Sequence, residues 1–384
     1  MKLQTKLNLI LFLVVIFGLA IVNLLRPHSE ESSNLEQREL MQLPEFTTER
    51  FFDGQYTRDF DNYFADNFAY RSTLVQVGSS MKDLKGFPDE NGVSIIVQGG
   101  DNMAGNTPDE PGEGQGEDSS VANVNSSKYL LLKDRAFIAF KYSAAAAETY
   151  AKTLNRFAAE VGPKVRVYSL LAPTSVEFTD NKNIQQLTES QKDAFAKVNE
   201  QLDPSIGRVD AYGGLEEHRD EYVFFRTDHH WSALGAYYAY EKFMETVGEK
   251  PVPLSKYKKS EIPNFLGTAY KQTLSDKLKS HPDTIAYYTP FTKYKYTMHT
   301  SATKSAEKKV VDPNFAKYSS TFYAVFLGGD YPWGEIETEN KNGKRIVVIK
   351  DSYANAFVPF LLPHFAQVYY LDPRHYEGNL LDFI

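Results

Sequence analysis

From residue 144 to residue 371, stretches with helical periodicity alternate with short apolar stretches. Helices are predicted at 144–161, 188–202, 232–247 and 353–362, and strands at 164–171, before Arg226, at 345–349 and at 366–371. When helices separate successive strands, the strands tend to form one sheet and the helices cover its faces. This order predicts an α/β fold, specifically a three-layer sandwich.

The N-terminus predicts a location outside the cytoplasm. Residues 7–25 are apolar except for two asparagines, and two lysines precede them. A run of this length can span a bilayer as a transmembrane helix, and the lysines before it hold the N-terminus in the cytoplasm. Because Arg26 and Pro27 follow in place of a small-residue cleavage site, we expect an uncleaved signal-anchor rather than a cleaved signal peptide. The rest of the chain is then extracytoplasmic, attached to the cell membrane by a single pass.

Four regions follow from these patterns. They are a cytoplasmic stub and anchor at 1–27, a helical and linker region packing on the main domain at 28–98, an acidic insertion at 99–127 and a catalytic domain at 128–384. The insertion has six acidic residues and no Lys or Arg, which predicts disorder, with a calcium-binding loop as the alternative. Aromatic residues between 51 and 64 recur at three- and four-residue spacings, which predicts a helix face packed in a core.

Composition excludes several functional classes. The formal net charge of −8 argues against a nucleic-acid partner, because binding phosphates requires a concentrated basic face. Cysteine is absent, so the chain has no disulfide, no thiolate metal ligand and no cysteine nucleophile. We expect no cofactor and no metal ion.

One group of residues that could carry chemistry precedes the predicted helix at 232–247. If Asp228 and His230 lie at the end of a strand, their side chains share a face, and His229 points to the other face. A carboxylate in this position can hold the imidazole in the tautomer that accepts a proton. Alternatively, Asp228 or Ser232 caps the helix. A metal site is a weaker alternative, because adjacent histidines on a strand diverge and no third ligand is nearby in sequence.

The second group follows the predicted strand at 345–349. Ser352 comes directly before a predicted helix, at the carboxyl end of a strand, where open α/β folds place their sites. The free N–H groups of a first helical turn can stabilise an oxyanion. An ordinary helix cap is the alternative interpretation of this serine.

Taken together, these runs resemble a known bacterial family, the one named for its Asp-His-His-Trp (DHHW) motif. That family is similar to the SGNH-hydrolase-like domains of alginate O-acetylation proteins. The resemblance covers about residues 40–384 and rests on Thr227-Asp228-His229-His230-Trp231, Phe326-Leu327-Gly328-Gly329, Lys350-Asp351-Ser352-Tyr353-Ala354-Asn355 and Asp372-Pro373-Arg374.

The resemblance implies an SGNH-like fold with a triad in circularly permuted order, in which Asp228 and His230 precede the nucleophile Ser352. Ordinary SGNH hydrolases have Gly-Asp-Ser near the N-terminus and Asp-x-x-His near the C-terminus. Here Lys350 replaces that glycine and the spacing is Asp-x-His. Candidates for oxyanion or substrate binding are Asn355, Arg374 and Tyr353. Residues 380–384 predict a helix that should lead to another strand, so we expect the chain to be truncated there.

Three functions are compatible with this pattern. The first is an O-acetyltransferase acting on a cell-surface polysaccharide, for which the resemblance implies a membrane-bound O-acyltransferase partner as the acetyl donor. The second is an acetyl esterase with the same triad, and the third is a non-catalytic glycan-binding or envelope protein. The Lys- and Tyr-rich segment at 250–320 predicts either a surface that binds an anionic glycan or a solvated loop.

Overall fold

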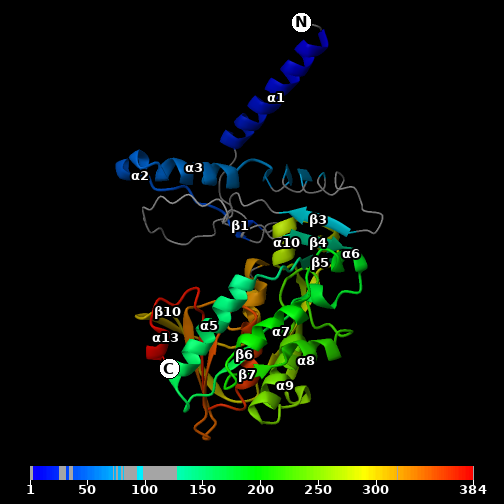
Figure 1. The fold of residues 1–384 in the computed structure, drawn as a ribbon. Coiled ribbons are helices and arrows are strands. Elements are labelled where there is room, and N and C mark those ends of the chain that lie inside the picture. The colour runs from blue at the N-terminus through cyan, green and yellow to red at the C-terminus, as the bar shows by residue number, and fades with distance from the viewer. Residues whose placement is uncertain are drawn as a thin grey trace. The chain divides into compact units, whose positions relative to one another are not determined.

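The computed structural model describes residues 3–25, 32–33, 38–71, 73–74, 77–78, 81, 93–97, 128–317 and 319–383 (Figure 1). The chain divides into two compact units, Met1–Lys85 with Leu274–Asp276, and Gly86–Thr273 with Lys277–Ile384. The predicted acidic insertion at 99–127 lies outside the described residues. The four regions expected from the sequence therefore stay predictions.

The first unit is mainly helical. Its elements are α1 (Leu3–Leu25), β1 (Ser32–Ser33), β2 (Arg38–Glu39), α2 (Thr48–Phe52) and α3 (Gln55–Asp66). Near the end of α1, the buried side-chain oxygen of Asn23 accepts a hydrogen bond from the backbone N–H of Ala69 at 2.8 Å. Among the described residues, no helix combines the length and the apolar character that crossing a bilayer requires. The anchor expected at residues 7–25 stays a prediction.

The aromatic residues between 51 and 64 do not form the predicted core face. Phe52 is 85% exposed and Phe60 is 39% exposed. Gly54 adopts a φ of 77°, in the left-handed region that glycine tolerates, and separates α2 from α3. The rings contact one another instead, as Tyr56 and Phe60 do at a centroid distance of 6.1 Å. The spacing indicated helical structure, but the assignment of this face to a core was wrong.

The largest sheet of the second unit has five strands in the order β11-β10-β12-β14-β13. Their bounds are β10 (Tyr294–Ser301), β11 (Lys304–Lys308), β12 (Trp333–Thr338), β13 (Arg345–Ile349) and β14 (Gln367–Leu371). Within this sheet β13 and β14 pair in parallel, and the other neighbouring strands pair antiparallel. The other ladders are antiparallel β3 (Val93–Val97), β4 (Lys128–Leu132) and β5 (Arg135–Ile138), parallel β6 (Tyr168–Leu170) and β7 (Gly207–Val209), and antiparallel β8 (Lys258–Phe265) and β9 (Asp283–Thr289).

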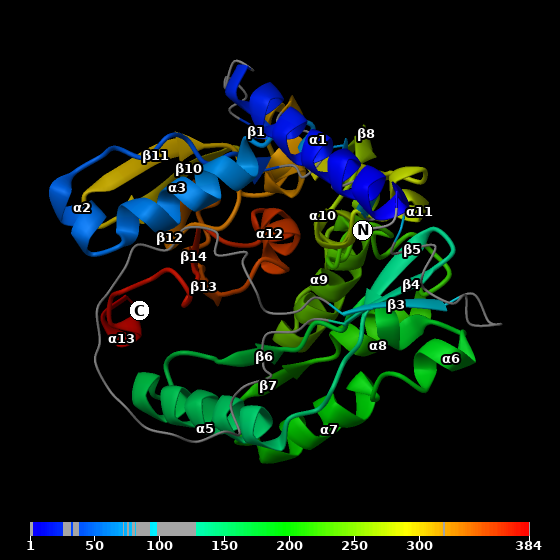
Figure 2. The ribbon, with the colours of Figure 1, turned by 90° about the horizontal axis from the view of Figure 1, so that it is seen from above.

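Several helices of this part of the chain begin at residues whose side chains accept from their free N–H groups. Ser143, Ser190 and Ser232 cap α5, α7 and α9 with their side chains. The helices are α5 (Ala144–Val161), α6 (Lys182–Gln185), α7 (Gln191–Gln201), α8 (Ala211–Glu217), α9 (Ala233–Val247), α10 (Thr268–Thr273), α11 (Asp276–Lys279), α12 (Ala354–Phe357) and α13 (Leu380–Phe383). In Figure 2, α5 and α7 lie side by side next to β6 and β7.

The fold is mixed α/β, as the alternation predicted, but the strands are arranged differently. The predicted strand before Arg226 is a bend with a single bridge, between Phe224 and Trp231. The segment at 250–320 is not a solvated loop, because it supplies β8 to β11. A surface there that binds an anionic glycan stays a prediction. Tyr288 and Tyr296 of this segment are buried. Buried and less buried residues alternate along β10, as expected of a strand. The lysine in this segment obscured that alternation in the sequence.

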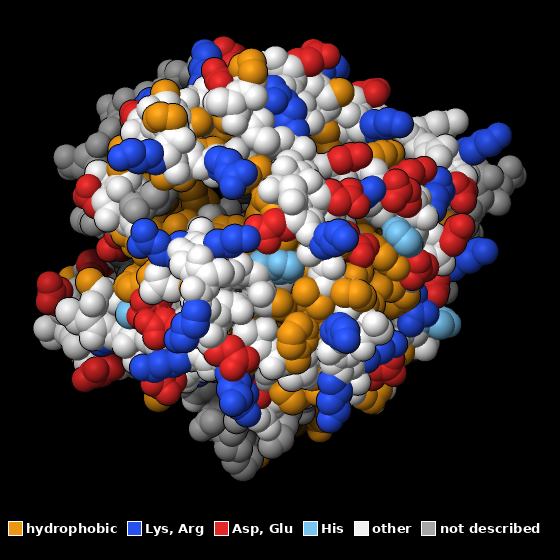
Figure 3. All heavy atoms as spheres, turned by 90° about the horizontal axis from the view of Figure 1, so that it is seen from below, with side chains coloured by type: hydrophobic (Ala, Val, Ile, Leu, Met, Phe, Trp, Pro, Cys, Tyr) orange, Lys and Arg blue, Asp and Glu red, His pale blue; other side chains and the backbone are white. Residues whose placement is uncertain are grey.

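The main core joins α9 to the five-stranded sheet and to the segment after Ser352. Tyr240, Phe360, Tyr296 and Tyr370 are almost completely buried there. The hydroxyls of Tyr296 and Tyr370 bond to each other at 2.6 Å, so these large rings can be buried without losing a polar partner. On the surface shown in Figure 3, acidic and basic side chains are interspersed with exposed hydrophobic ones. The core thus fixes the two segments that carry Asp228, His230 and Ser352.

Candidate active site

The Asp-His-His-Trp segment is a reversing loop rather than the end of a strand. The backbone bridge between Phe224 and Trp231 closes the loop, and Phe225 N–H donates to the carbonyl of His230 at 3.4 Å. Strand alternation therefore does not explain why Asp228 and His230 share a side. The cause is local, because Asp228 Oδ1 accepts hydrogen bonds from the backbone N–H of His230 at 2.9 Å and from its ring.

Three predicted site residues meet in a chain of hydrogen bonds. His230 Nδ1 lies 2.6 Å from Asp228 Oδ1, and His230 Nε2 lies 2.7 Å from Ser352 Oγ. Asp228 is 2% exposed and His230 is 5% exposed. Ser352 follows β13, at the turn into α12, so the strand-to-helix position expected from the sequence is confirmed. Neither alternative interpretation as a helix cap applies to Asp228 or Ser352, because Ser232 caps α9 and no side chain caps α12.

A second contact holds the Asp228 carboxylate from its other side. Thr268 N–H donates to Asp228 Oδ2 at 2.7 Å. Burial alone would raise the pKa of Asp228, but the interactions with His230, His229 and Thr268 outweigh it and hold that pKa well below its usual range. Asp228 is therefore an anion wherever the protein is folded at ordinary pH. This is the state needed to orient an imidazole.

Gly267 is a residue that the sequence analysis did not single out. A Cβ at this position would lie 2.2 Å from Asp228 Cβ and 2.5 Å from Asp228 Oδ2. No such contact is tolerated, so a side chain here must displace Asp228 or its own backbone. A glycine before a helix carries no distinctive sequence signal, which explains why it was missed.

We therefore expect Gly267→Ala to lower kcat by about 10²-fold, because a displacement of about 1 Å in a catalytic group has an effect of that size. The measurement is steady-state hydrolysis of p-nitrophenyl acetate. Gly18→Ala is the control, since a Cβ at Gly18 has no atom within 4 Å. Unchanged kcat in a folded Gly267→Ala protein would show that Asp228 does not depend on this close packing.

Tyr323, in the 3-10 helix η4 (Ser319–Val325), is a second residue that was missed. Its ring stacks on the imidazole of His230 at a centroid distance of 3.9 Å and an interplanar angle of 8°. Its hydroxyl is buried and, among the described residues, has no hydrogen-bond partner. Burial, reinforced by the charge of Asp228, raises the pKa of Tyr323 well above its usual value, so the hydroxyl remains a neutral donor. The electron-rich ring face can stabilise the imidazolium form of His230.

The ring and the hydroxyl of Tyr323 can be separated by substitution. We expect Tyr323→Leu to lower kcat by about fivefold, because a desolvated cation–π contact is worth roughly 1 kcal/mol. Tyr323→Phe keeps the stack and should restore that part of the rate. The pH profiles of kcat for the two variants provide the check, and identical profiles would contradict a role for the ring face.

The three candidates for oxyanion binding are held by other groups. Asn355 Nδ2 donates to Asp330 Oδ1 at 2.8 Å, and Arg374 donates to Asp330 Oδ2 at 3.0 Å. The Tyr353 hydroxyl donates to the carbonyl of His229 and so fixes the reversing loop. Asn355 and Arg374 thus meet on Asp330, which sequence analysis did not identify. An oxyanion role for these three residues stays a prediction.

Lys350, at the position where SGNH hydrolases have glycine, lies between two carboxylates. Its side chain is completely buried, and Nζ lies 3.3 Å from Asp330 Oδ1 and 3.6 Å from Asp372 Oδ2. Burial would raise the pKa of Asp330, but Lys350, Asn355 and Arg374 hold it below its usual value. Lys350 therefore neutralises the buried carboxylate of Asp372 and the partly exposed one of Asp330, next to the strand that precedes the serine.

The Asp-His-His segment also meets one criterion for a metal site. One ligand atom from each of Asp228, His229 and His230 lies within 4.8 Å of the others, so the expectation that the histidines diverge was wrong. However, both ring nitrogens of His230 are already engaged by Asp228 and Ser352. Burial and the neighbouring His230 lower the pKa of His229 to about 4. A metal ion here would have to break the hydrogen bonds of the triad.

The family is decided by a match between residues 89–371 and the family model described as DHHW protein. The chain belongs to the DHHW family. A DHHW family protein from Eubacterium siraeum is 34% identical, with a TM-score of 0.61 over 67% of this chain and 86% of that one. No curated protein matches the chain.

More distant solved structures share the fold of this DHHW protein. Bacillus cereus PatB1 is 23% identical, with a TM-score of 0.58 over 67% of this chain and 92% of that one. A second PatB1 structure, with a sulfonyl adduct, is 21% identical, with a TM-score of 0.56 over 67% of this chain and 90% of that one. The O-acetyltransferase domain of Pseudomonas putida AlgJ is matched at 15% identity and a TM-score of 0.31, too low to carry an argument.

Proposed function

We propose that this DHHW protein is an acyltransferase in which Ser352 is the nucleophile, His230 the general base and Asp228 the group that orients the imidazole. The observation that carries the proposal is the continuous chain from Asp228 through His230 to Ser352, with heavy-atom distances of 2.6 and 2.7 Å. A general base must lie within about 2.6 to 3.2 Å of the proton it removes. The fold shared with PatB1 is compatible with this chemistry but does not establish it.

The reaction takes place in two half-reactions. His230 Nε2 accepts the proton of Ser352 as Oγ attacks the acyl carbonyl of the donor. The imidazolium then gives that proton to the leaving oxygen, and an acyl ester remains on Ser352. In the second half, His230 removes a proton from an acceptor hydroxyl, which attacks the ester and releases Ser352 Oγ, to which the proton returns. The acceptor is a sugar hydroxyl in a transferase and water in an esterase.

The proposed acceptor is a cell-surface polysaccharide and the proposed acyl group is acetyl, both on the basis of the family resemblance. The proposed location is outside the cytoplasm, on the basis of the apolar run at residues 7–25 of the sequence. Acetyl-CoA is confined to the cytoplasm, so an extracytoplasmic enzyme needs acetyl groups passed across the membrane. A membrane-bound O-acyltransferase is the proposed partner for that step.

The test uses the full-length chain in detergent with p-nitrophenyl acetate, with and without glycan oligomers. We expect nitrophenol release and, with a suitable oligomer, an increase in oligomer mass by one acetyl group. Release of nitrophenol with acetate as the only product would favour the esterase. No release from a folded protein would favour a non-catalytic glycan-binding role.

A chelator added to the same assay should leave the rate unchanged, and a loss of rate that zinc restores would favour a metal at Asp228, His229 and His230.

A further inference from the structure

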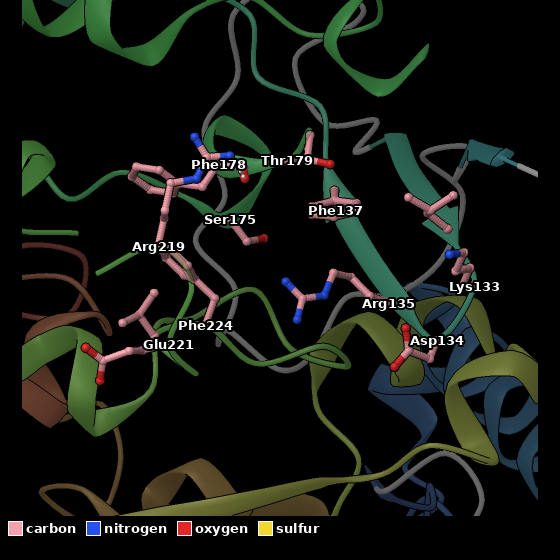
Figure 4. A pocket seen from close by; sticks show the side chains of 12 residues that line it. Lys133, Asp134, Arg135, Phe137, Ser175, Phe178, Thr179, Arg219, Glu221 and Phe224 are labelled. Carbon is pink, nitrogen blue, oxygen red and sulfur yellow. Dashed lines mark hydrogen bonds between the residues drawn. The ribbon is translucent and has the colours of Figure 1, made fainter. Parts of the chain in front are cut away.

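A pocket of about 240 Å³ lies apart from the triad. The turn between β4 and β5 forms one side of it, and η1 (Ser175–Phe178) and the segment ending at Phe224 form the other (Figure 4). None of Asp228, His230 and Ser352 lines this pocket. Its volume suits a ligand of about the size of one sugar ring.

Most charges around the pocket are already neutralised by partners. Arg219 pairs with Asp180 at 2.5 Å and with Glu216 at 3.3 Å. Asp134 pairs with Arg226 at 3.1 Å. Glu221 pairs with His218 at 2.7 Å and also accepts a hydrogen bond from Tyr238. Neither of the two acids that line the pocket is left to compensate a further cation.

Arg135 is the exception among the buried or half-buried cations of this pocket. Its side chain is half-buried, and among the described residues it forms neither a hydrogen bond nor an ion pair. Its guanidinium lies over the ring of Phe137, whose centroid is 6.0 Å from Cζ. Figure 4 shows the guanidinium of Arg135 and the hydroxyl of Ser175 both directed into the pocket. A partly desolvated guanidinium without an acceptor favours an anion there.

The aromatic side chains that line the pocket indicate the kind of molecule that carries the anionic group. Phe178 and Phe224 stack at a centroid distance of 5.5 Å, and Phe137 is buried opposite them. Such aromatic walls suit the C–H faces of a pyranose, while the hydroxyl of Ser175 can bond to a sugar hydroxyl. One unpaired guanidinium compensates about one negative charge, and its planar fork matches a carboxylate.

We propose that this pocket binds the carboxylate-bearing sugar residue of an acidic glycan. The inference rests on the proposed function, because it identifies that glycan as the polysaccharide acceptor. The pocket is joined to the catalytic loop through the backbone: Phe224 pairs with Trp231, and Ala136 N–H donates to the carbonyl of Arg226 at 2.9 Å. A polymer held at this pocket presents its other residues to Ser352 at a raised effective concentration.

The experiment measures binding to the full-length Ser352→Ala chain, so that no turnover interferes. The probes are an oligogalacturonate, the same oligomer with its carboxyls reduced to alcohols, and glucose 6-phosphate. The affinity for each probe is measured by isothermal titration calorimetry. We expect the oligogalacturonate to bind and the reduced oligomer to bind at least tenfold more weakly. Equal binding of the two oligomers would overturn the proposal, as would tighter binding of glucose 6-phosphate than of the oligogalacturonate.

Two substitutions locate the binding. Arg135→Gln should weaken oligogalacturonate affinity at least tenfold while the circular dichroism spectrum and melting temperature stay unchanged. Arg156→Gln is the matched control, because Arg156 lies on α5 with its side chain 76% exposed and should leave the affinity as it is. Retained affinity in Arg135→Gln would overturn the assignment. If the protein releases nitrophenol but does not bind oligogalacturonate, the pocket proposal is wrong and the proposed acyl transfer stands. If it binds oligogalacturonate but releases no nitrophenol, the proposed acyl transfer is wrong and the pocket proposal stands.

Discussion

Ser352→Ala and His230→Ala are each expected to lower kcat for p-nitrophenyl acetate by about 10⁴-fold or more, the loss typical for members of a catalytic triad. Ser352 supplies the atom that attacks, and His230 is 2.7 Å from it and removes its proton. Asp228→Asn should retain a larger residual activity, because it disturbs the tautomer of the imidazole and leaves nucleophile and base in place. The melting temperature of each variant should show that it is folded.

His229→Ala is the control for this series. The ring centroid of His229 lies 3.9 Å from that of His230, but the hydrogen bond that His229 forms with Tyr353 is through its backbone carbonyl. The substitution keeps that carbonyl, so the loss in rate should be far smaller than for His230→Ala. If folded His229→Ala were as inactive as His230→Ala, the assignment of the base to His230 would have to be abandoned.

The largest expected effect on stability comes from Lys350→Met. This change leaves Asp330 and Asp372 without the cation that lies 3.3 and 3.6 Å from them. Removing one partner of a buried ion pair costs about 3–5 kcal/mol, because the remaining charge is buried and uncompensated. We expect a loss of this size in the free energy of unfolding measured in urea. Arg374 still pairs with both carboxylates, which favours the lower end of that range.

Lys344→Met is the matched surface control. Its side chain is 48% exposed and pairs with Glu249. Exposed pairs contribute about 0–1 kcal/mol, so the free energy of unfolding should change little. Equal effects of the two substitutions would show that the buried position of Lys350 has no special energetic weight.

The sequence predicted the parts of the site that depend on local patterns. A strand, a turn and a helix around Ser352 are encoded by residues close together in the chain, and so is the capping of α9 by Ser232. The pairing of Asp228 with His230 was also predicted, although for the wrong reason. A short carboxylate two residues before an imidazole can bond to its backbone N–H, and this contact forms in a bend without a strand.

The rest of the site depends on contacts between distant segments. Asp330, Lys350 and Asp372 come together only because β13 and β14 pair in parallel and the turn at 328–330 reaches their ends. Gly267 and Tyr323 act on Asp228 and His230 from segments about 40 and 90 residues away, and no spacing rule connects them. The expectation that the predicted strands form one sheet was wrong for the same reason, because pairing partners are chosen by the packing of the whole core.

The central claim is that Ser352 carries the acyl group, and covalent labelling tests it directly. The full-length chain would be treated with an aryl sulfonyl fluoride, digested and mapped by mass spectrometry, alongside Ser352→Ala. Because His230 lies 2.7 Å from Ser352 Oγ, we predict one sulfonyl group on Ser352, none in Ser352→Ala, and loss of p-nitrophenyl acetate hydrolysis in step with labelling. Full labelling at another residue, or equal labelling of Ser352→Ala, would contradict the account.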